Sequence, residues 1–133
     1  MAMTVLYAES LYDNASVERE VYGAGIKVVW RKVADLSELA ATDCADVDGL
    51  MVMRHGVTAA HYSQFPKLRC VVRMGVGYDK LDRKAAAERK VLVCNVPDYG
   101  TTEVADHAIA LALSLRRGII LHLEAQRRPQ PAA

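Results

Sequence analysis

Cysteine, aromatic residues and long apolar runs are all scarce in this sequence. The three cysteines, Cys44, Cys70 and Cys94, include no C-x-x-C pair. Their odd number and spacing exclude a disulfide framework and a cysteine-rich zinc site. Cys70 and Cys94 lie inside apolar runs, and free cysteine is among the most buried residue types. We therefore expect buried, reduced thiols in a cytoplasmic protein.

Positive and negative charges are nearly balanced in the chain. Lysine and arginine total 17 against 16 for aspartate and glutamate, so no basic face for nucleic acid or for a membrane surface is indicated. The most apolar long stretch, residues 104–123, is interrupted by Asp106, Arg116 and Arg117, which argues against a membrane span. His61, His107 and His122 have no partner at metal-ligand spacing, so no metal site is expected. We expect small molecules or other proteins as partners.

Short apolar runs alternate regularly with segments that favour helices. The runs are rich in valine and do not alternate with polar residues, as is typical of parallel strands covered on both faces. They are Thr4–Ala8, Ile26–Trp30, Gly49–Met53, Cys70–Met74 and Val91–Val96, and the helical segments between them are Ser16–Tyr22, Leu36–Ala41, Thr58–Gln64 and Leu81–Lys90. The pattern predicts an α/β fold, a flavodoxin-like doubly wound parallel sheet of about five strands.

A long helix is predicted after the sheet. Residues 95–100 break the strand pattern, and Thr101 or Thr102 begins a helix that runs to about Leu123, with a bend expected at Gly118. Its apolar residues lie on more than one side, so it should have neighbours on several faces. We divide the chain into a sheet domain over residues 1–98, a helix over 99–123 and an irregular tail over 124–133.

The turn Gly75-Val76-Gly77 after the fourth apolar run allows three interpretations. A dinucleotide site is disfavoured, because the position of the third fingerprint glycine is Lys80. An anion site is favoured by backbone amides that no side chain shields, next to a helix that Asp79 is expected to cap. The turn could equally be only structural. Covalent acyl chemistry is not supported, since neither Ser10 nor Ser114 lies in a nucleophile-elbow glycine pattern.

Three cationic or titratable side chains stand near strand ends. Arg54 and His55 end the third run, at the sheet edge where ligands of α/β proteins collect. A substrate role and an ordinary exposed loop are both open for Arg54, and the loop is favoured for His55. Arg73 lies inside a predicted buried strand, so we expect a structural ion pair for it.

Several motifs in order resemble one known family. The stretch from Val71 to Asp82, then Val93-Cys94-Asn95-Val96-Pro97, then residues 102–107 (TEVADH), is similar to the D-isomer-specific 2-hydroxy-acid dehydrogenases. Within that family the chain looks closest to the branch of the C-terminal-binding-protein corepressors. The resemblance is specific from about Leu50 to Arg117. Lys80 departs from it, since asparagine is usual there.

The resemblance implies roles for particular residues. Arg54, Gly75, Val76 and Gly77 would bind the substrate, a small 2-hydroxy or 2-keto acid, with the Val76 and Gly77 amides on its carboxylate. Thr102 and Val104 would approach the cofactor, NAD or NADP. The helix over 102–123 would lead to a nucleotide-binding domain and support a homodimer. No catalytic residue is expected in this chain, because the family's catalytic arginine, glutamate and histidine lie beyond residue 133.

Three functions follow as hypotheses. The parent protein would exchange hydride between NAD and a 2-hydroxy acid, and the 133 residues alone would be inactive. Alternatively, the chain would be a non-catalytic interaction module, as the corepressor branch permits. A free-standing flavodoxin-like signalling module is disfavoured, because the third run ends in Met53-Arg54 without an acceptor aspartate.

Overall fold

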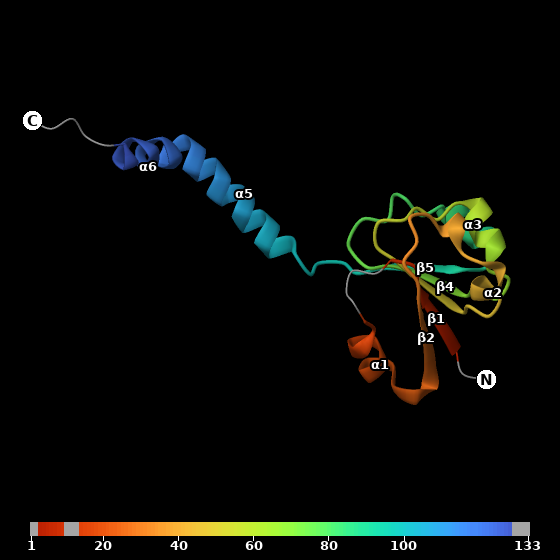
Figure 1. Ribbon diagram of the computed structural model, residues 1–133. Coiled ribbons are helices and arrows are strands. Elements are labelled where there is room, and N and C mark those ends of the chain that lie inside the picture. The colour runs from red at the N-terminus through yellow and green to blue at the C-terminus, as the bar shows by residue number, and fades with distance from the viewer. Residues whose placement is uncertain (1–2, 10–13, 129–133) are drawn as a thin grey trace, which may run out of the picture. The chain divides into compact units, whose positions relative to one another are not determined.

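The computed structural model describes residues 3–9 and 14–128 (Figure 1). The chain divides into two compact units, Met1–Pro97 and Asp98–Ala133. The first unit carries the sheet and the second carries two helices. Of the irregular tail predicted over residues 124–133, residues 124–127 instead belong to a helix that ends at Arg127, and residues 129–133 lie outside the described residues.

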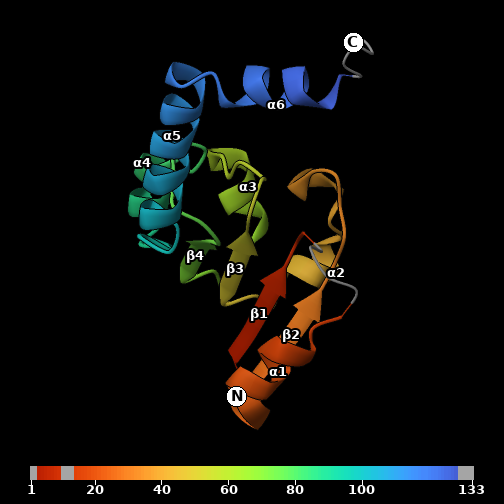
Figure 2. The same ribbon diagram turned by 90° about the vertical axis from the view of Figure 1, so that its left-hand side faces the viewer.

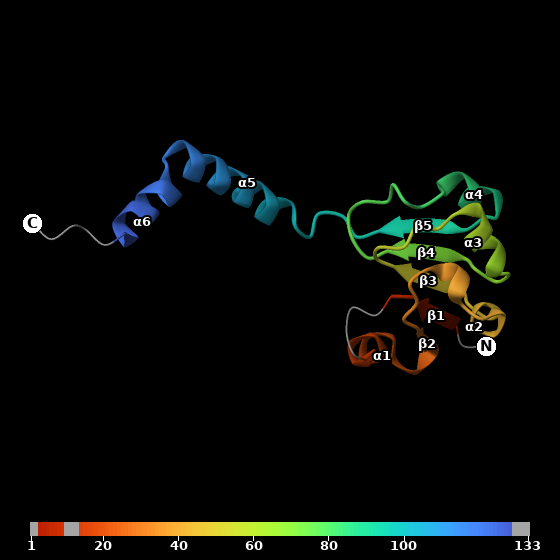
Figure 3. The same cartoon turned by 45° about the horizontal axis from the view of Figure 1, so that its top comes forward.

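The first unit is built on one parallel sheet of five strands. The strands are β1 (Met3–Tyr7), β2 (Ile26–Trp30), β3 (Gly49–Val52), β4 (Cys70–Arg73) and β5 (Leu92–Asn95). Their order is β2-β1-β3-β4-β5, with every neighbouring pair parallel (Figure 3). The chain places β2 on one side of β1 and then adds β3, β4 and β5 on the other side, as in a flavodoxin-like doubly wound sheet. The predicted fold class and all five strands are thus confirmed.

Short helices connect the strands. These are α1 (Ser16–Tyr22), the 3₁₀ turns η1 (Gly23–Gly25) and η2 (Leu36–Glu38), α2 (Ala41–Cys44), α3 (Ala59–Gln64) and α4 (Arg83–Glu88). The helix predicted over Leu36–Ala41 is instead η2 followed by α2. Thr58 caps α3 by accepting the amide of His61. Asp82, and not the predicted Asp79, caps α4 by accepting the amide of Ala85 at 3.0 Å.

The core lies on one face of the sheet. Leu6, Leu50 and Val71 point to this face and are fully buried, together with Tyr62 and Phe65 from α3 and its end. Figure 2 shows α1 next to β1 and β2, apart from α3 and α4. On the opposite face the side chains of β4 and β5 stay half-buried or exposed. The prediction that every strand is covered on both faces is therefore wrong for these two strands.

The incomplete cover of the sheet also exposes cysteines that were expected to be buried. Cys44 is buried, as predicted, but Cys70 is half-buried and Cys94 is exposed. All three are free thiols. The prediction of burial is wrong for Cys94 because β5 is an edge strand, and no helix of the first unit, as described, covers its outward face.

The second unit contains α5 (Thr101–Arg116) and α6 (Ile119–Arg127). One helix to about Leu123 was predicted, but Gly118 adopts φ 61°, ψ 30° and ends α5. A glycine in this left-handed conformation is a common helix terminator, because it has no Cβ to oppose it. No residue of either helix is buried. In the described part of the chain, no helix has the length and apolar character needed to cross a bilayer.

Candidate substrate-binding site

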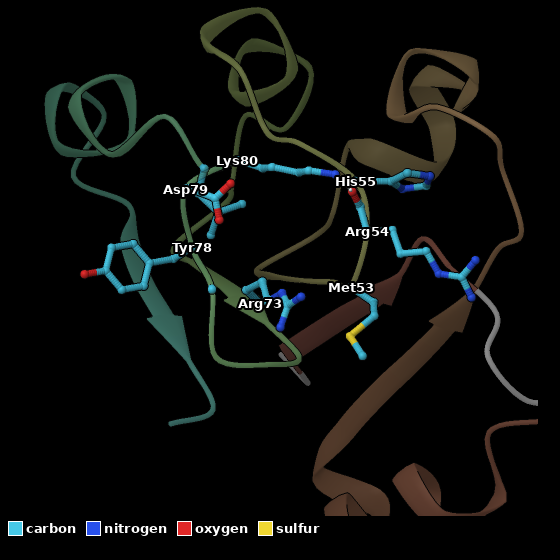
Figure 4. Close-up of a pocket in the computed structure, with 9 residues that line it drawn as sticks. Met53, Arg54, His55, Arg73, Tyr78, Asp79 and Lys80 are labelled. Carbon is cyan, nitrogen blue, oxygen red and sulfur yellow. Dashed lines mark hydrogen bonds between the residues drawn. The ribbon is translucent and has the colours of Figure 1, made fainter. Parts of the chain in front are cut away.

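A cleft of about 230 Å³ opens where β3 and β4 end. Carboxyl ends of parallel strands are where doubly wound sheets bind ligands. The cleft is lined from the loop after β3 by Met53, Arg54 and His55, and from β4 and the loop after it by Arg73, Gly77, Tyr78, Asp79, Lys80 and Leu81 (Figure 4). Two of the predicted site residues, Arg54 and Gly77, therefore line one cleft.

The carboxylate of Glu9 organises the loop after β3. Glu9 lies two residues after the end of β1 and is only 8% exposed. Its oxygens accept the backbone N–H of Met53 at 2.9 Å, that of Arg54 at 2.8 and 2.7 Å, and that of His55. His55 Nδ1 also lies 3.3 Å from Glu9 Oε1. A buried carboxylate surrounded by amide donors fixes the loop backbone, because each donor would otherwise be unsatisfied.

The two loops that form the cleft are joined by a short ladder. Val57 pairs with Leu81 in a parallel bridge, with Val57 N–H donating to the Lys80 carbonyl at 3.0 Å and Asp82 N–H donating to the Val57 carbonyl at 2.9 Å. Lys80 Nζ reaches the Arg54 carbonyl at 3.4 Å. Figure 4 shows Lys80 extended across toward Arg54 and His55. Lys80, where the family usually has asparagine, thus links the two walls of the cleft.

Gly75 leaves room for the side chain of Arg73. Gly75 is buried, and a Cβ placed on it would lie 1.5 Å from Arg73 Nη1. The guanidinium therefore occupies the space that any other residue at position 75 would take. Gly75 itself does not line the cleft, but it allows Arg73 to do so.

The predicted ion pair of Arg73 is not found among residues 3–9 and 14–128. Arg73 is half-buried and lines the cleft. A guanidinium without an acidic partner in the described structure is available to an anionic ligand. The prediction erred because a residue in the last position of a strand can turn its side chain toward the strand end and not into the core.

The amides of Val76 and Gly77 are available as donors. Gly75 N–H donates to the Arg73 carbonyl and the Val76 carbonyl accepts from Asn95 Nδ2 at 2.7 Å, which fixes the turn. Within the described residues neither Val76 N–H nor Gly77 N–H donates to a protein acceptor. Gly77 has no left-handed φ, and a Cβ there would meet Asp79 Oδ1 at 3.2 Å. Two neighbouring free amides at a turn are suited to a carboxylate.

Positive charge predominates around the cleft. Arg54, Arg73 and Lys80 supply three cations against one carboxylate, that of Asp79. Figure 4 shows the Arg54 side chain extending away from Tyr78 and Asp79, so Arg54 flanks the cleft. The cations and the free amides together favour a small anion. Among the described residues no cluster of three metal-ligating side chains occurs.

A comparison with protein-family models identifies the family of this chain. The model for the catalytic domain of the D-isomer specific 2-hydroxyacid dehydrogenases matches residues 5–129. The chain belongs to this family. The dehydrogenase assignment confirms the resemblance found in the motifs between Val71 and residue 107.

Individual relatives agree with the family. Glyoxylate/hydroxypyruvate reductase B of Escherichia coli K12 is 38% identical over 93 residues, which are 67% of this chain and 29% of the reductase. The NADPH-dependent glyoxylate/hydroxypyruvate reductase of Sinorhizobium meliloti, solved with NADP and malonate, is 30% identical with a TM-score of 0.73, covering 100% of this chain and 43% of that one. D-Lactate dehydrogenase of Aquifex aeolicus, at 20% identity, TM-score 0.73 and coverages of 96% and 39%, shares the fold. The chain thus spans less than half the length of these relatives.

The glycine turn of the first unit does not fit a dinucleotide. The fingerprint needs a helix that starts directly at the turn, with a third glycine at the helix–strand contact. Here α4 starts at Arg83, well after Gly77, and has only six residues. Asp79 also places a carboxylate 3.2 Å from where a Gly77 Cβ would lie. No step of the reaction is therefore assigned to a cofactor at this turn.

The predicted cofactor contacts Thr102 and Val104 lie in the first turn of α5, in the second unit, and both are exposed. Their role as cofactor contacts stays a prediction. Sequence reasoning missed two residues of the site: Arg73, which lines the cleft, and Glu9, which does not line it but holds the loop after β3. The signal for Glu9 was its place directly after the first apolar run, where a carboxylate has no reason to be buried unless it holds a neighbouring loop.

Proposed function

We propose that this chain is the substrate-binding part of an NAD- or NADP-dependent oxidoreductase that interconverts 2-hydroxy acids and 2-keto acids. The observation that carries the proposal is the cationic cleft at the ends of β3 and β4, in a chain of the 2-hydroxyacid dehydrogenase family. Two of the named relatives are reductases of glyoxylate and hydroxypyruvate, and the one from Sinorhizobium meliloti is NADPH-dependent. A small 2-keto acid of that kind is the proposed substrate.

The carboxylate of the substrate would be held by the N–H groups of Val76 and Gly77. Both are free of protein acceptors in the described structure, and hydrogen bonds from amides to a carboxylate are charge-assisted. Arg54 would flank the same anion, and Gly75 would serve indirectly by making room for Arg73. These residues bind and orient; we assign no proton transfer to any of them.

The 133 residues alone would be inactive as a dehydrogenase. The glycine turn of the first unit does not fit a dinucleotide, and hydride transfer needs a bound nicotinamide. In the complete enzyme Thr102 and Val104 would approach the cofactor and the helices of residues 102–123 would contribute to a homodimer. The exposed apolar side chains of α5 and α6 support such an interface.

Calorimetric titration with hydroxypyruvate tests the proposal on the chain as it is. We expect saturable binding with a dissociation constant on the order of 1 mM, since a fragment-sized ligand gains little affinity from a few contacts. Hydroxyacetone, which keeps the ketone and hydroxyl but lacks the carboxylate, should not bind. Arg73→Met should weaken binding about tenfold, whereas the matched variant Arg89→Met, in an exposed position after α4, should not. Equal binding of hydroxypyruvate and hydroxyacetone would overturn the proposal.

A further inference from the structure

The thiols of Cys70 and Cys94 lie against each other on the less covered face of the sheet. The register aligns Cys70 of β4 with Leu92 of β5, and Val72 with Cys94. The two cysteines are therefore diagonal neighbours whose side chains leave the same face. Their sulfurs are 3.9 Å apart. Neither cysteine lines the substrate cleft, so this pair is a separate feature of the molecule.

The strand geometry opposes a direct bond between the two sulfurs. Diagonal neighbours on adjacent strands have Cα atoms about 7–8 Å apart, whereas a disulfide requires about 4.4–6.8 Å. A direct bond would therefore pull β4 and β5 out of their register. An atom placed between the sulfurs would leave both strands where they are.

The separation fits one kind of bridging atom. Bonds from zinc to thiolate sulfur measure about 2.3 Å, and two such bonds to sulfurs 3.9 Å apart meet at about 116°. This angle is close to the tetrahedral value that zinc and its heavier relatives adopt. We propose that Cys70 and Cys94 form a two-thiolate site for a soft divalent ion of the zinc group, with water or solution ligands in the remaining positions.

Solvent access is consistent with such a site, whereas the nearby charges act in two directions. Cys94 is exposed on the edge strand, so an ion reaches the pair from solvent. Asp48, Arg69 and Lys90 share a surface hollow with Cys70, and Arg83 borders another with Cys94. Three of these four groups are cations, which favour thiolate formation but oppose the approach of a free metal ion.

Binding converts both thiols to thiolates, so each ion displaces two protons into solvent and no electron moves. Burial, with Cys94 nearby, raises the pKa of Cys70 to about 11, so the ion must compete with a proton at neutral pH. With two protein ligands instead of the four of a closed structural site, we expect a dissociation constant on the order of 1–100 µM.

A cadmium titration of the reduced full chain tests the site. The ultraviolet charge-transfer absorption of cadmium thiolate should rise to saturation at one ion per chain, and zinc should reverse it. Cys94→Ser changes an exposed residue and should weaken binding at least tenfold, as should Cys70→Ser. Cys44→Ser is the matched control, because Cys44 is buried away from the pair in α2, and it should bind as the wild type does.

Three outcomes would overturn the proposal. One is equal cadmium affinity in the wild type and Cys94→Ser, with circular dichroism showing both folded. Another is a stoichiometry of one ion per two chains, which would place the two sulfurs on different molecules. The third is formation of an intramolecular Cys70–Cys94 disulfide under a mild thiol oxidant without loss of fold, together with no cadmium binding by the reduced chain.

Discussion

The carboxylate of Glu9 accepts the backbone N–H of Arg54 with both of its oxygens, at 2.8 and 2.7 Å. The two residues are 45 positions apart in the sequence, and the contact joins the end of β1 to the end of β3. The position of one wall of the cleft therefore depends on a residue that does not line the cleft. Ligand binding and stability are linked through this carboxylate.

Replacing Glu9 with glutamine should lower both stability and ligand affinity. A glutamine offers one acceptor oxygen and turns an NH₂ group toward amide donors, so at least one donor loses its partner. We expect a loss of about 2 kcal/mol in the free energy of unfolding, measured by urea denaturation. The control is Glu20→Gln, on the exposed side of α1, which should change stability by less than about 0.5 kcal/mol. Equal losses in the two variants would refute the role of Glu9.

Gly75→Ala should act on the substrate through Arg73. The new Cβ would take the space of Arg73 Nη1, and the long arginine side chain moves more easily than the backbone. We therefore expect a stability change within about 1 kcal/mol, but hydroxypyruvate binding as weak as in Arg73→Met. The double variant should be no worse than either single variant. Gly100→Ala is the control, since no atom lies within 4 Å of a Cβ at that position.

If the effects of Gly75→Ala and Arg73→Met on binding were additive, the glycine would act independently of the arginine. The turn would then contribute to the site only through its own backbone, and the contact between these two residues would have no functional consequence.

Alkaline pH should destabilise the fold through Tyr62. Burial raises the pKa of Tyr62 from 10.0 to about 12, because the neutral phenol is favoured inside the core. A pKa raised by folding gives stability that is complete below about pH 10 and is lost as the pH rises through about 12. Urea denaturation from pH 8 to 11.5 should show a decline of about 1–2 kcal/mol more in the wild type than in Tyr62→Phe.

Exposed Tyr99 provides the comparison for Tyr62. Tyr99 is 64% exposed, so Tyr99→Phe should follow the wild-type pH profile. Tyr7, whose pKa burial also raises, is present in every variant and does not alter the difference between them. A Tyr62→Phe protein with the alkaline profile of the wild type would show that Tyr62 reaches solvent before it ionises.

The second unit should associate. Val104, Leu115 and Leu121 are 69%, 82% and 72% exposed, and no residue of α5 or α6 is buried in the single chain. Contiguous apolar surface of this kind is rare on monomers. Light scattering at about 100 µM should show dimers or larger species, and a version ending at Asp98 should be monomeric. A monomeric full chain would contradict the predicted dimer helix.

The strands could be predicted from the sequence because each is a short valine-rich run between helix-forming segments. Which faces of the sheet are covered by helices could not be predicted, since an apolar run such as Val91–Val96 has the same sequence pattern whether one or both of its faces are packed. The break in the long helix was visible only as Gly118, because a glycine permits a left-handed residue without requiring one. Asp79 was expected to cap the fourth helix, but the loop after Gly77 continues to Asp82, which is the cap.

The cleft was predictable in part. Arg54 and Gly77 were placed by their positions after two parallel strands, which meet at one edge of a sheet. Arg73 was not assigned to the cleft, because its position depends on the space left by Gly75. The role of Glu9 was not predicted, because it depends on hydrogen bonds to residues 53–55, more than 40 positions away. The roles of Val76, Thr102 and Val104 stay predictions.

Backbone NMR of the full chain is the most direct test of the central claim, that the first unit binds a 2-keto acid and not a dinucleotide. Titration with hydroxypyruvate should shift the amide signals of Val76 and Gly77 most, because a hydrogen bond to a carboxylate changes the environment of the donor proton directly. NADH at millimolar concentration should leave these two signals in place. Saturable NADH shifts at Val76 and Gly77, or hydroxypyruvate shifts confined to residues outside the cleft, would contradict the account.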